Sequence, residues 1–389
     1  MANADIVAYN IAAFLATLFL LEFGADKFID HTAVVARRTG IAETLIGLLT
    51  AGGEWEELAV VIASLARNRA SLAIGNIIGS AISNILGAFS LGLLFHPKNT
   101  PIHFDRSSRI YSLILLVLTT FVAPVSYFSR KTIWLACGSI LIACFALYIA
   151  SVGWAISRGS LTAPEDSDSD SDDSSDDESS RGASTVVVER TLPASDGHKD
   201  EANGSSLVEA DEEATPAASP PSPQAPAASR RKHRTLRYHI FYLFLGFFAI
   251  CLAGYVLSHA ATTITDEFGI SDVLFGVVFL AIATTLPEKF IAVMSGHRGQ
   301  VGILVANTTG SNIFLLALCA GIVMLDTSGH FERGNVNIAE LGVLWGSTLA
   351  FTATIWFGGR FCQWIGAAML IAYVAFIVLE FTVIHNVVT

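Results

Sequence analysis

The stretch VVFLAIATTLPEKFIAVM, residues 277–294, decides the fold because it carries a carboxylate inside an apolar run. A membrane-spanning helix needs about 20 mostly apolar residues. An ionised side chain at the centre of such a helix costs roughly 2.5–3.5 kcal/mol on insertion scales, so a carboxylate found there usually has a function. Pro287 directly precedes Glu288 and removes a helical hydrogen bond, which frees carbonyl oxygens to face an ion. The stretch therefore predicts an interrupted membrane helix with a cation-binding glutamate.

The composition of the whole chain also indicates a membrane protein. Of its 389 residues, 52% are hydrophobic and 15% are charged, whereas a soluble domain carries about 25% charged residues. Ten runs are long and apolar enough to span a bilayer: 6–28, 41–65, 71–95, 109–128, 132–157, 238–262, 271–294, 300–325, 338–357 and 361–385. We expect an all-α membrane protein with ten transmembrane helices.

Residues 158–237 separate the first five runs from the last five. This segment holds 17 acidic and 9 basic residues, so most of the formal charge of −11 is located there. It contains EDSDSDSDDSSDDESS and ATPAASPPSPQAPAAS, which lack the apolar residues needed to offset the entropy of ordering. We expect a disordered acidic and Pro-rich loop. Its serines could be phosphorylated by a kinase or contacted by a regulatory partner, and a merely solvating linker is an equal alternative.

The charge distribution predicts how the chain is oriented. The loop ends in a basic cluster directly before a span, formed by Arg230, Arg231, Lys232, Arg234 and Arg237. Such a cluster favours the cytoplasmic side and an anionic lipid surface. We therefore expect a cytoplasmic loop and two non-cytoplasmic termini. The acidic loop is typical of a eukaryotic protein, and both an intracellular store (vacuole or endomembrane) and the plasma membrane remain open as locations.

The two halves repeat each other in sequence. GIAETLIG at 40–47 parallels GISDVLFG at 269–276, and Glu57 precedes Asn76 by the same 19 positions that separate Glu288 from Asn307. Five spans is an odd number, so the second half must enter the membrane from the opposite side. Inverted repeats of this kind place a substrate site near the midplane, where the repeats meet. The expected organisation is a first repeat at 1–157, the loop at 158–237 and a second repeat at 238–389.

Oxygen-bearing side chains gather in both halves. Glu54 and Glu57 are three positions apart and would share one helix face, while Glu56 would point elsewhere. Ser80 and Asn84, four positions apart, would also share a face. Carboxylate, hydroxyl and amide oxygens suit a hard cation such as Ca²⁺. No His or Cys lies near these positions, which disfavours zinc or copper there.

Other residues of the spans have simpler interpretations. Trp55 could be a gate or a packing aromatic, of which packing is favoured. Gly75, Gly79 and Ala81 are expected to allow two helices to approach closely. The remaining acids of the spans are expected at helix ends, facing water: Asp5, Asp30, Glu43, Asp272 and Glu340.

These motifs resemble the cation/Ca²⁺ exchanger superfamily, the sodium/calcium exchanger membrane region. Its repeats carry a signature close to G-T-S-x-P-E, followed by G-N-x-x-G-S-N-x-x-N. TTLPE at 284–288 and GNIIGSAISN at 75–84 match it well, and the resemblance covers both membrane halves but not the loop. It implies two inverted five-helix repeats and gating by the first helix, near Gly24-Ala25-Asp26. It also implies ion ligands at Glu57, Glu288, Ser80, Asn84, Thr284, Thr285 and Ser311.

The first repeat departs from this signature. GGEWEE replaces Thr-Ser-x-Pro-Glu, so Gly53 and Glu54 stand at the two hydroxyl positions, and Glu54 becomes an additional candidate ligand. In the second repeat, Leu315 stands where the family has Asn or Asp. One ligand is lost and one carboxylate is gained, so ion selectivity is expected to differ, and proton-coupled exchange becomes plausible.

The function expected is secondary antiport of Ca²⁺ against Na⁺ or H⁺ by alternating access. No Walker-type loop is present, so the energy must come from another gradient. We expect no enzyme, no tightly bound cofactor and no nucleic-acid partner; the partners are inorganic cations and the bilayer. The alternatives are a transport-impaired membrane sensor or scaffold of the same fold, and an exchanger with altered cation selectivity.

Overall fold

The structure, a computed structural model, describes residues 4–38, 54–97, 102–128, 130–157, 236–327, 335–359 and 361–385. Its described elements are all helical. Eight helices are long and apolar enough to cross a membrane, and a ninth span forms if one bent pair is counted as a single span. These nine spans match nine of the ten expected. The tenth, expected at 41–65, is described only from Glu54 onward, and residues 41–53 lie outside the described part.

Each half contributes the same series of elements. The first half contains α1 (Ala4–Arg38), α3 (Trp55–Ala66), α4 (Ala70–Ile82), the π-helical segment η1 (Ser83–Phe89), α5 (Ser90–Leu94), α6 (Arg106–Tyr127) and α7 (Lys131–Ser157). The second half contains α8 (Leu236–Phe268), α9 (Asp272–Leu274), η2 (Phe275–Leu280), α10 (Ala281–Thr284), α11 (Leu286–His297), α12 (Val301–Ile313), η3 (Phe314–Cys319), α13 (Ala320–Thr327), α14 (Ile338–Phe357), α15 (Cys362–Leu379) and η4 (Glu380–Ile384).

The internal repeat extends to the ends of individual helices. A shift of 231 positions carries Glu57 onto Glu288. The same shift carries both ends of α3 onto those of α11, and both ends of α4 onto those of α12. It also carries the first residue of η1 onto that of η3. The repeat predicted from a few polar positions therefore governs where the central helices begin, end and change to π-helical winding.

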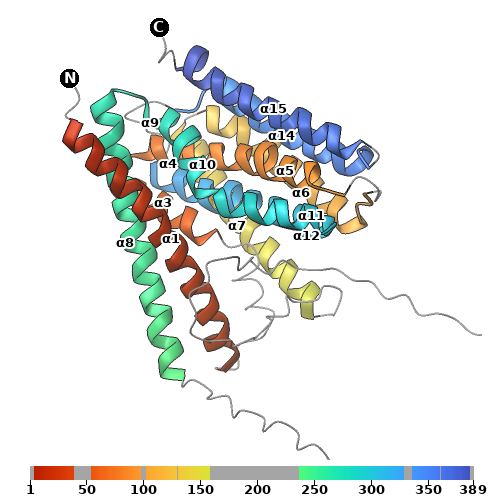
Figure 1. The fold of residues 1–389 in the computed structure, drawn as a ribbon, viewed down its shortest axis with the longest axis horizontal. Coiled ribbons are helices and arrows are strands. Elements are labelled where there is room, and N and C mark those ends of the chain that lie inside the picture. The colour runs from red at the N-terminus through yellow and green to blue at the C-terminus, as the bar shows by residue number, and fades with distance from the viewer. Residues whose placement is uncertain are drawn as a thin grey trace, which may run out of the picture.

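Helices α1 and α8 form a long pair at one side of the bundle (Figure 1). They approach closely at glycines: a Cβ at Gly24 would lie 2.9 Å from the backbone nitrogen of Ile250, and one at Gly246 would lie 2.5 Å from that of Phe28. Both helices are longer than the expected spans. Asp30 was expected at a helix end but lies inside α1, because no glycine or proline between Phe28 and Arg38 stops the helix.

The most buried layer consists of the repeat-related segments α4–η1–α5 and α12–η3–α13. In their most apolar windows, 89% and 78% of the residues are buried, against 22% for α1. Helix α4 lies very close to α9 and η2. A Cβ at Gly79 would lie 2.5 Å from the Cα of Val277 in η2, and one at Gly75 would lie 2.7 Å from the carbonyl oxygen of Val273 in α9. The close approach predicted for these two glycines is confirmed, and it joins the two halves at their centre.

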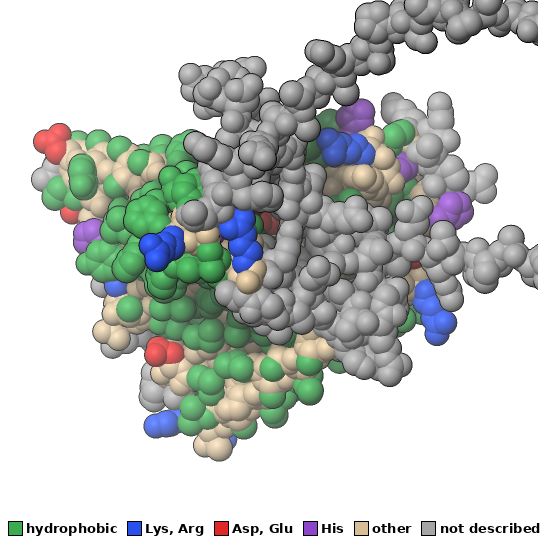
Figure 2. Space-filling model, turned by 90° about the horizontal axis from the view of Figure 1, so that it is seen from below, with side chains coloured by type: hydrophobic (Ala, Val, Ile, Leu, Met, Phe, Trp, Pro, Cys, Tyr) green, Lys and Arg blue, Asp and Glu red, His purple; other side chains and the backbone are tan. Residues whose placement is uncertain are grey.

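Apolar side chains cover much of the described outer surface (Figure 2). Examples are Phe19, Phe357 and Trp364, which are 80%, 86% and 78% exposed. An apolar surface of this extent is costly in water and stable against lipid. It agrees with a multi-pass integral membrane protein.

Two of the five acids expected to face water are buried instead. Asp272 is 2% exposed, and its carboxylate accepts two hydrogen bonds from Arg69, at 3.0 and 3.1 Å, and one from Thr265. Glu340 is 0% exposed and forms a capping box with Asn337 at the start of α14. The expectation was wrong because a carboxylate in the first helical turn can be satisfied without water, by a backbone N–H at Glu340 and by a distant arginine at Asp272. Asp5 is exposed in the first turn of α1, as expected, and Glu43 lies outside the described residues.

The side chain of Arg69, which directly precedes α4, contacts both the end of α8 and the start of α9. Its Nη2 also donates to Asp266, at 2.6 Å. Burial alone would lower the pKa of Arg69, but the hydrogen bonds to Asp266 and Asp272 outweigh burial and raise this pKa above its usual value. Arg69 therefore keeps its charge and holds the start of α4 against α9.

Candidate ion site

The site begins with a broken helix in the second half. Helix α10 ends at Thr284 and α11 begins at Leu286, and the segments on either side of the break are inclined by 49°. Pro287 lies in the first turn of α11, where its missing N–H would have no helical partner in any case. The TTLPE motif thus creates the break that sequence analysis predicted, and it places Glu288 in the first turn of α11.

The equivalent helix start in the first half is α3. Glu54 is the residue before this helix, and Glu56 and Glu57 lie in its first turn. Acidic side chains are stabilised at a helix N-terminus by the unpaired backbone N–H groups and the helix dipole. GGEWEE and TTLPE therefore present acids from two repeat-related helix starts.

Glu57 is fully buried and held by donors from both halves. Its Oε1 accepts hydrogen bonds from the hydroxyls of Ser80, at 2.8 Å, and Thr284, at 2.6 Å. Its Oε2 accepts a hydrogen bond from the side-chain amide of Asn76. The structure thus brings together three of the predicted ligand residues. Asn76 was not predicted as a partner, although its constant spacing from Glu57 was visible in the sequence.

Glu288 lies in a second group of acids, with Glu54 and Glu56. One carboxylate oxygen from each residue lies within 4.8 Å of the others. Glu54 and Glu288 are each 5% exposed, and Glu54 is also within interaction distance of Ser311. One buried oxygen each of Glu54 and Glu288 accepts no hydrogen bond from the described residues. Carboxylates this close repel one another unless a cation or proton lies between them.

The expectation that Glu56 points away from Glu54 is wrong. Helix α3 begins only at Trp55, and Glu54 has φ −73° and ψ 67°, which is not helical. The rule that residues three apart share a face applies inside a helix, so it does not extend to Glu54. A carboxylate at this non-helical position lies next to Glu56 instead.

Thr285, the second hydroxyl of TTLPE, contacts a lysine. The Nζ of Lys289 donates to Ser83 Oγ at 2.8 Å, to the Thr285 carbonyl at 3.1 Å, and to the Thr285 hydroxyl. The Tyr373 hydroxyl completes this group by donating to Ser83 Oγ at 2.9 Å. Lys289 was not predicted as a site residue, although a lysine next to Glu288 in an apolar run indicates a role in the site.

The remaining predicted ligands differ in their surroundings. Asn84 is 1% exposed, and its side-chain amide makes no hydrogen bond with the described residues. Leu315, its equivalent in the repeat, is fully buried and apolar. Gly53 lies outside the described residues. On α12, the Thr309 hydroxyl and the Asn312 carbonyl oxygen are also buried without a described hydrogen-bond partner.

Helix α1 contributes aromatic and acidic groups next to this centre. Trp55 packs edge-on against Phe28 of α1 and Phe314 of η3, with ring centroids 5.6 and 6.2 Å apart. Glu22, on α1, is close enough to interact electrostatically with Glu54. The packing role expected of Trp55 is confirmed, and it connects α1 to both halves of the site.

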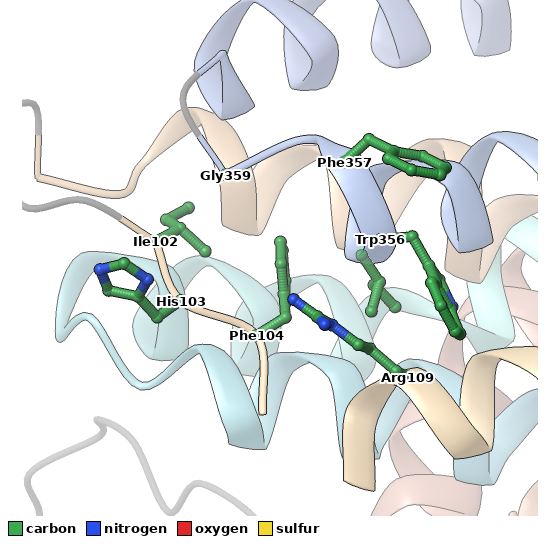
Figure 3. Close-up of a pocket in the computed structure, with 8 residues that line it drawn as sticks. Ile102, His103, Phe104, Arg109, Trp356, Phe357 and Gly359 are labelled. Carbon is green, nitrogen blue, oxygen red and sulfur yellow. The ribbon is translucent and has the colours of Figure 1, made fainter. Parts of the chain in front are cut away.

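A surface pocket of about 490 Å³ lies elsewhere, where α6 begins and α14 ends (Figure 3). Arg109 lies 5.8 Å from the centre of the Trp356 ring on this pocket's wall. The lining residues are Ile102, His103, Phe104, Arg109, Ile355, Trp356, Phe357 and Gly359. This lining contains no carboxylate, so the pocket does not belong to the acidic centre.

Comparison with known proteins gives one consistent result. A family model described as "Sodium/calcium exchanger protein" matches residues 9–154 and 238–382. Sodium/calcium exchanger MaX1 of Methanosarcina acetivorans is 24% identical, over 96% of this chain and 99% of that protein.

Two solved structures share the fold. One is the sodium-calcium exchanger NCX_Mj, soaked with 2.5 mM Na⁺ and 10 mM Sr²⁺, with a TM-score of 0.52 and 20% identity over 96% of this chain and 99% of that chain. The other is native YfkE, with a TM-score of 0.59 and 14% identity over 96% of this chain and 91% of that chain.

Proposed function

This chain belongs to the sodium/calcium exchanger protein family, and we propose that it exchanges Ca²⁺ for a monovalent cation at the acids of α3 and α11. Membership of this family, with the exchanger from Methanosarcina acetivorans among its relatives, supports a membrane cation antiporter. The ion site and the counter-ion are the parts that we propose.

The observation that carries the proposal is the group formed by Glu54, Glu56 and Glu288. Their oxygens lie within 4.8 Å of one another, and two of these oxygens lack described hydrogen-bond donors. Ca²⁺ takes six to eight oxygen ligands from carboxylates, carbonyls, hydroxyls and water. Three carboxylates, with Ser311 beside them, supply both the oxygens and the negative charge that a divalent cation requires.

Glu57 has a different role in this proposal. Its carboxylate already accepts hydrogen bonds from Asn76, Ser80 and Thr284, so its orientation is fixed. Three donors hold this carboxylate in one orientation, so it can attract a nearby cation without binding it directly. It therefore serves as a fixed electrostatic anchor, while Glu54, Glu56 and Glu288 exchange ligands with the transported ion.

The contacts of Lys289 favour a low number of counter-ions exchanged for each Ca²⁺. Its ammonium already binds three oxygens, from Ser83 and Thr285. A small monovalent cation would use oxygens of the same kind. Lys289 therefore acts as a built-in monovalent cation that neutralises one carboxylate charge, so fewer free Na⁺ ions or protons are needed to replace Ca²⁺.

Alternating access would come from the α1–α8 pair. This pair lies at one side of the bundle (Figure 1), and Phe28 of α1 contacts Trp55 at the start of α3. Glycine contacts between α1 and α8 favour movement of the two helices as one unit. Sliding of the pair across the start of α3 would open the acids first to one side of the membrane and then to the other.

Flux in proteoliposomes tests the proposal. Radiolabelled Ca²⁺ uptake is measured with an imposed Na⁺ gradient, an imposed H⁺ gradient, or neither. We expect uptake with at least one gradient and none without. Absence of flux under every gradient would reject antiport and leave the transport-impaired sensor of the same fold. A comparison of the two gradients identifies the counter-ion.

A further inference from the structure

A second group of ionisable side chains lies where α14 begins and α15 ends. These helices run side by side (Figure 1), so the start of one meets the end of the other. Glu340 lies in the first turn of α14, Glu380 begins η4 directly after α15, and His385 follows η4. None of the three belongs to the helices that carry the proposed transport site.

The three side chains point at one another. The Nε2 of His385 lies 3.1 Å from Oε1 of Glu340 and 3.4 Å from Oε2 of Glu380. One ligand atom from each residue lies within 4.8 Å of the other two. Both glutamates are 0% exposed, whereas the His385 side chain is 11% exposed. The group is thus buried on the carboxylate side and accessible on the imidazole side.

Hydrogen bonding within the described structure does not satisfy Glu380. Neither of its carboxylate oxygens accepts a hydrogen bond from a described residue, and both are inaccessible to solvent. The Nε2 of His385 has at most one proton, and the nearer acceptor is Glu340. Even a protonated His385 would leave one of the two carboxylate charges uncompensated. A buried charge without a partner is costly, so the geometry calls for a further cation.

We propose that Glu340, Glu380 and His385 bind a divalent transition-metal ion, for which Zn²⁺ is the best match. One imidazole nitrogen and two carboxylate oxygens, completed by a water molecule, form a four-coordinate donor set typical of zinc. Imidazole is a preferred ligand of transition metals, whereas Ca²⁺ and Mg²⁺ prefer oxygen alone. This site is therefore distinct from the all-oxygen transport site in both position and donor chemistry.

The metal would join the beginning of α14 to the end of α15. Glu340 already accepts a hydrogen bond from the backbone nitrogen of Asn337, which orients its other oxygen toward His385. A ligand that is itself hydrogen-bonded is oriented for the metal in advance. The metal would therefore stabilise these helix ends, and its effect should appear as stability rather than as a requirement for transport.

The test uses the full chain purified in detergent and freed of metal with a chelator. Zn²⁺ binding is measured by competition with a chromogenic zinc indicator, in a Glu288→Gln background that weakens the transport site. The test variants add His385→Gln or Glu380→Gln to this background. We expect one zinc equivalent in the background protein and at least tenfold weaker binding in each test variant. Equal zinc affinity in all three proteins would overturn the proposal.

Thermal unfolding gives a second readout, because the wild-type chain and His385→Gln carry the same transport site and differ only at the proposed zinc site. Zn²⁺ should raise the Tm of the wild-type chain, because a ligand that binds the folded state stabilises it. It should leave the Tm of His385→Gln unchanged. His385 lies at a partly exposed position after the last helical segment, so its substitution should preserve folding and Ca²⁺ flux. A Tm that does not respond to Zn²⁺ in the wild type means that the two carboxylates share a proton instead, and this too would overturn the proposal.

Discussion

The hydroxyl of Thr284, in the second half of the chain, donates a 2.6 Å hydrogen bond to Oε1 of Glu57, in the first half. This bond crosses between the repeats at the point where α10 ends. It couples the orientation of the first-half carboxylate to the helix break that positions Glu288. The two motifs are therefore parts of one centre, and a change in one half should alter ion binding by the other.

Removal of that bond should weaken ion binding. In Thr284→Val the shape is nearly kept but the donor is lost, and a hydrogen bond to a charged group is worth about 1.5–3 kcal/mol. We expect the Ca²⁺ concentration for half-maximal uptake to rise roughly tenfold or more. Thr284→Ser is the matched control, because it retains the hydroxyl and should stay near wild type. Equal affinities in the valine and serine variants would show that the bond is irrelevant to ion binding.

Neutralisation of Glu288 should abolish most exchange. Glu288→Gln keeps the size of the side chain but removes one of three carboxylate charges from the group with Glu54 and Glu56. We expect Ca²⁺ uptake to fall to background in proteoliposomes. The control is Asp326→Asn, which removes a charge from an exposed position at the end of α13. Wild-type uptake by Glu288→Gln would show that the ion binds elsewhere.

Removal of the Lys289 charge should change the coupling between ions. Lys289→Met leaves the oxygens of Ser83 and Thr285 without their ammonium partner, so a free cation can take its place. We expect the positive charge exchanged per Ca²⁺ to rise by about one, because lysine carries one charge. The measurement is the reversal potential of Ca²⁺ flux under known gradients. Lys289→Arg keeps the charge and should retain the wild-type value, and an unchanged value in both variants would contradict the role given to Lys289.

The two halves should respond differently to the same glycine substitution. Gly79 and Gly310 are equivalent in the repeat, but only Gly79 lies against another backbone: its Cβ would be 2.5 Å from the Cα of Val277, whereas a Cβ at Gly310 has nothing within 4 Å. Gly79→Ala should therefore separate α4 from η2 and lower the Tm and the folded yield. Gly310→Ala should leave both unchanged. A similar loss in the two variants would mean that the close crossing does not limit stability.

The Arg69–Asp272 pair should matter for stability rather than for transport. Asp272→Asn removes one of the two carboxylates that pair with Arg69, while Asp266 remains. Loss of a hydrogen bond to a charged group costs about 1.5–3 kcal/mol. Asp272→Asn should therefore lower the Tm of the detergent-solubilised protein. Glu267→Gln, another acid neutralised near the end of α8, serves as a comparison at a less buried position and should lower the Tm less. A Tm for Asp272→Asn equal to the wild-type value would rule out this role.

The helices were readily predictable, because apolar runs of the required length follow from the thickness of a bilayer. The positions of Glu57 and Glu288 followed from a constant spacing to Asn76 and Asn307. The neighbours and hydrogen-bond partners of these acids could not be predicted from the sequence in the same way. Glu56 was assigned to the wrong face because sequence periodicity does not reveal where a helix begins, and α3 begins one residue after Glu54.

The burial of Asp272 and Glu340, near helix ends, also could not be predicted from the sequence. Asp272 and Glu340 look like exposed caps when each helix is considered alone. Their burial depends on partners that are distant in the chain: Arg69 for Asp272, and Glu380 with His385 for Glu340. The same limit applies to Lys289, whose oxygen partner Ser83 lies 206 positions away. Contacts between the halves are not encoded in the local pattern of either half.

The shift of 231 positions that relates the two halves affects the relative energies of the states in the proposed transport cycle. If the two inverted halves were identical, a two-fold rotation about an axis in the membrane plane would convert the inward-facing form into the outward-facing form, and the two would have equal energy. Here the helix ends coincide, but Glu54 stands at the position of Thr285, and Leu58 stands at the position of Lys289. These differences, together with the packing difference between Gly79 and Gly310, make the two energies unequal. In the proposed alternating-access cycle, the empty carrier therefore prefers one side, and its two rate constants of reorientation differ before any gradient is applied.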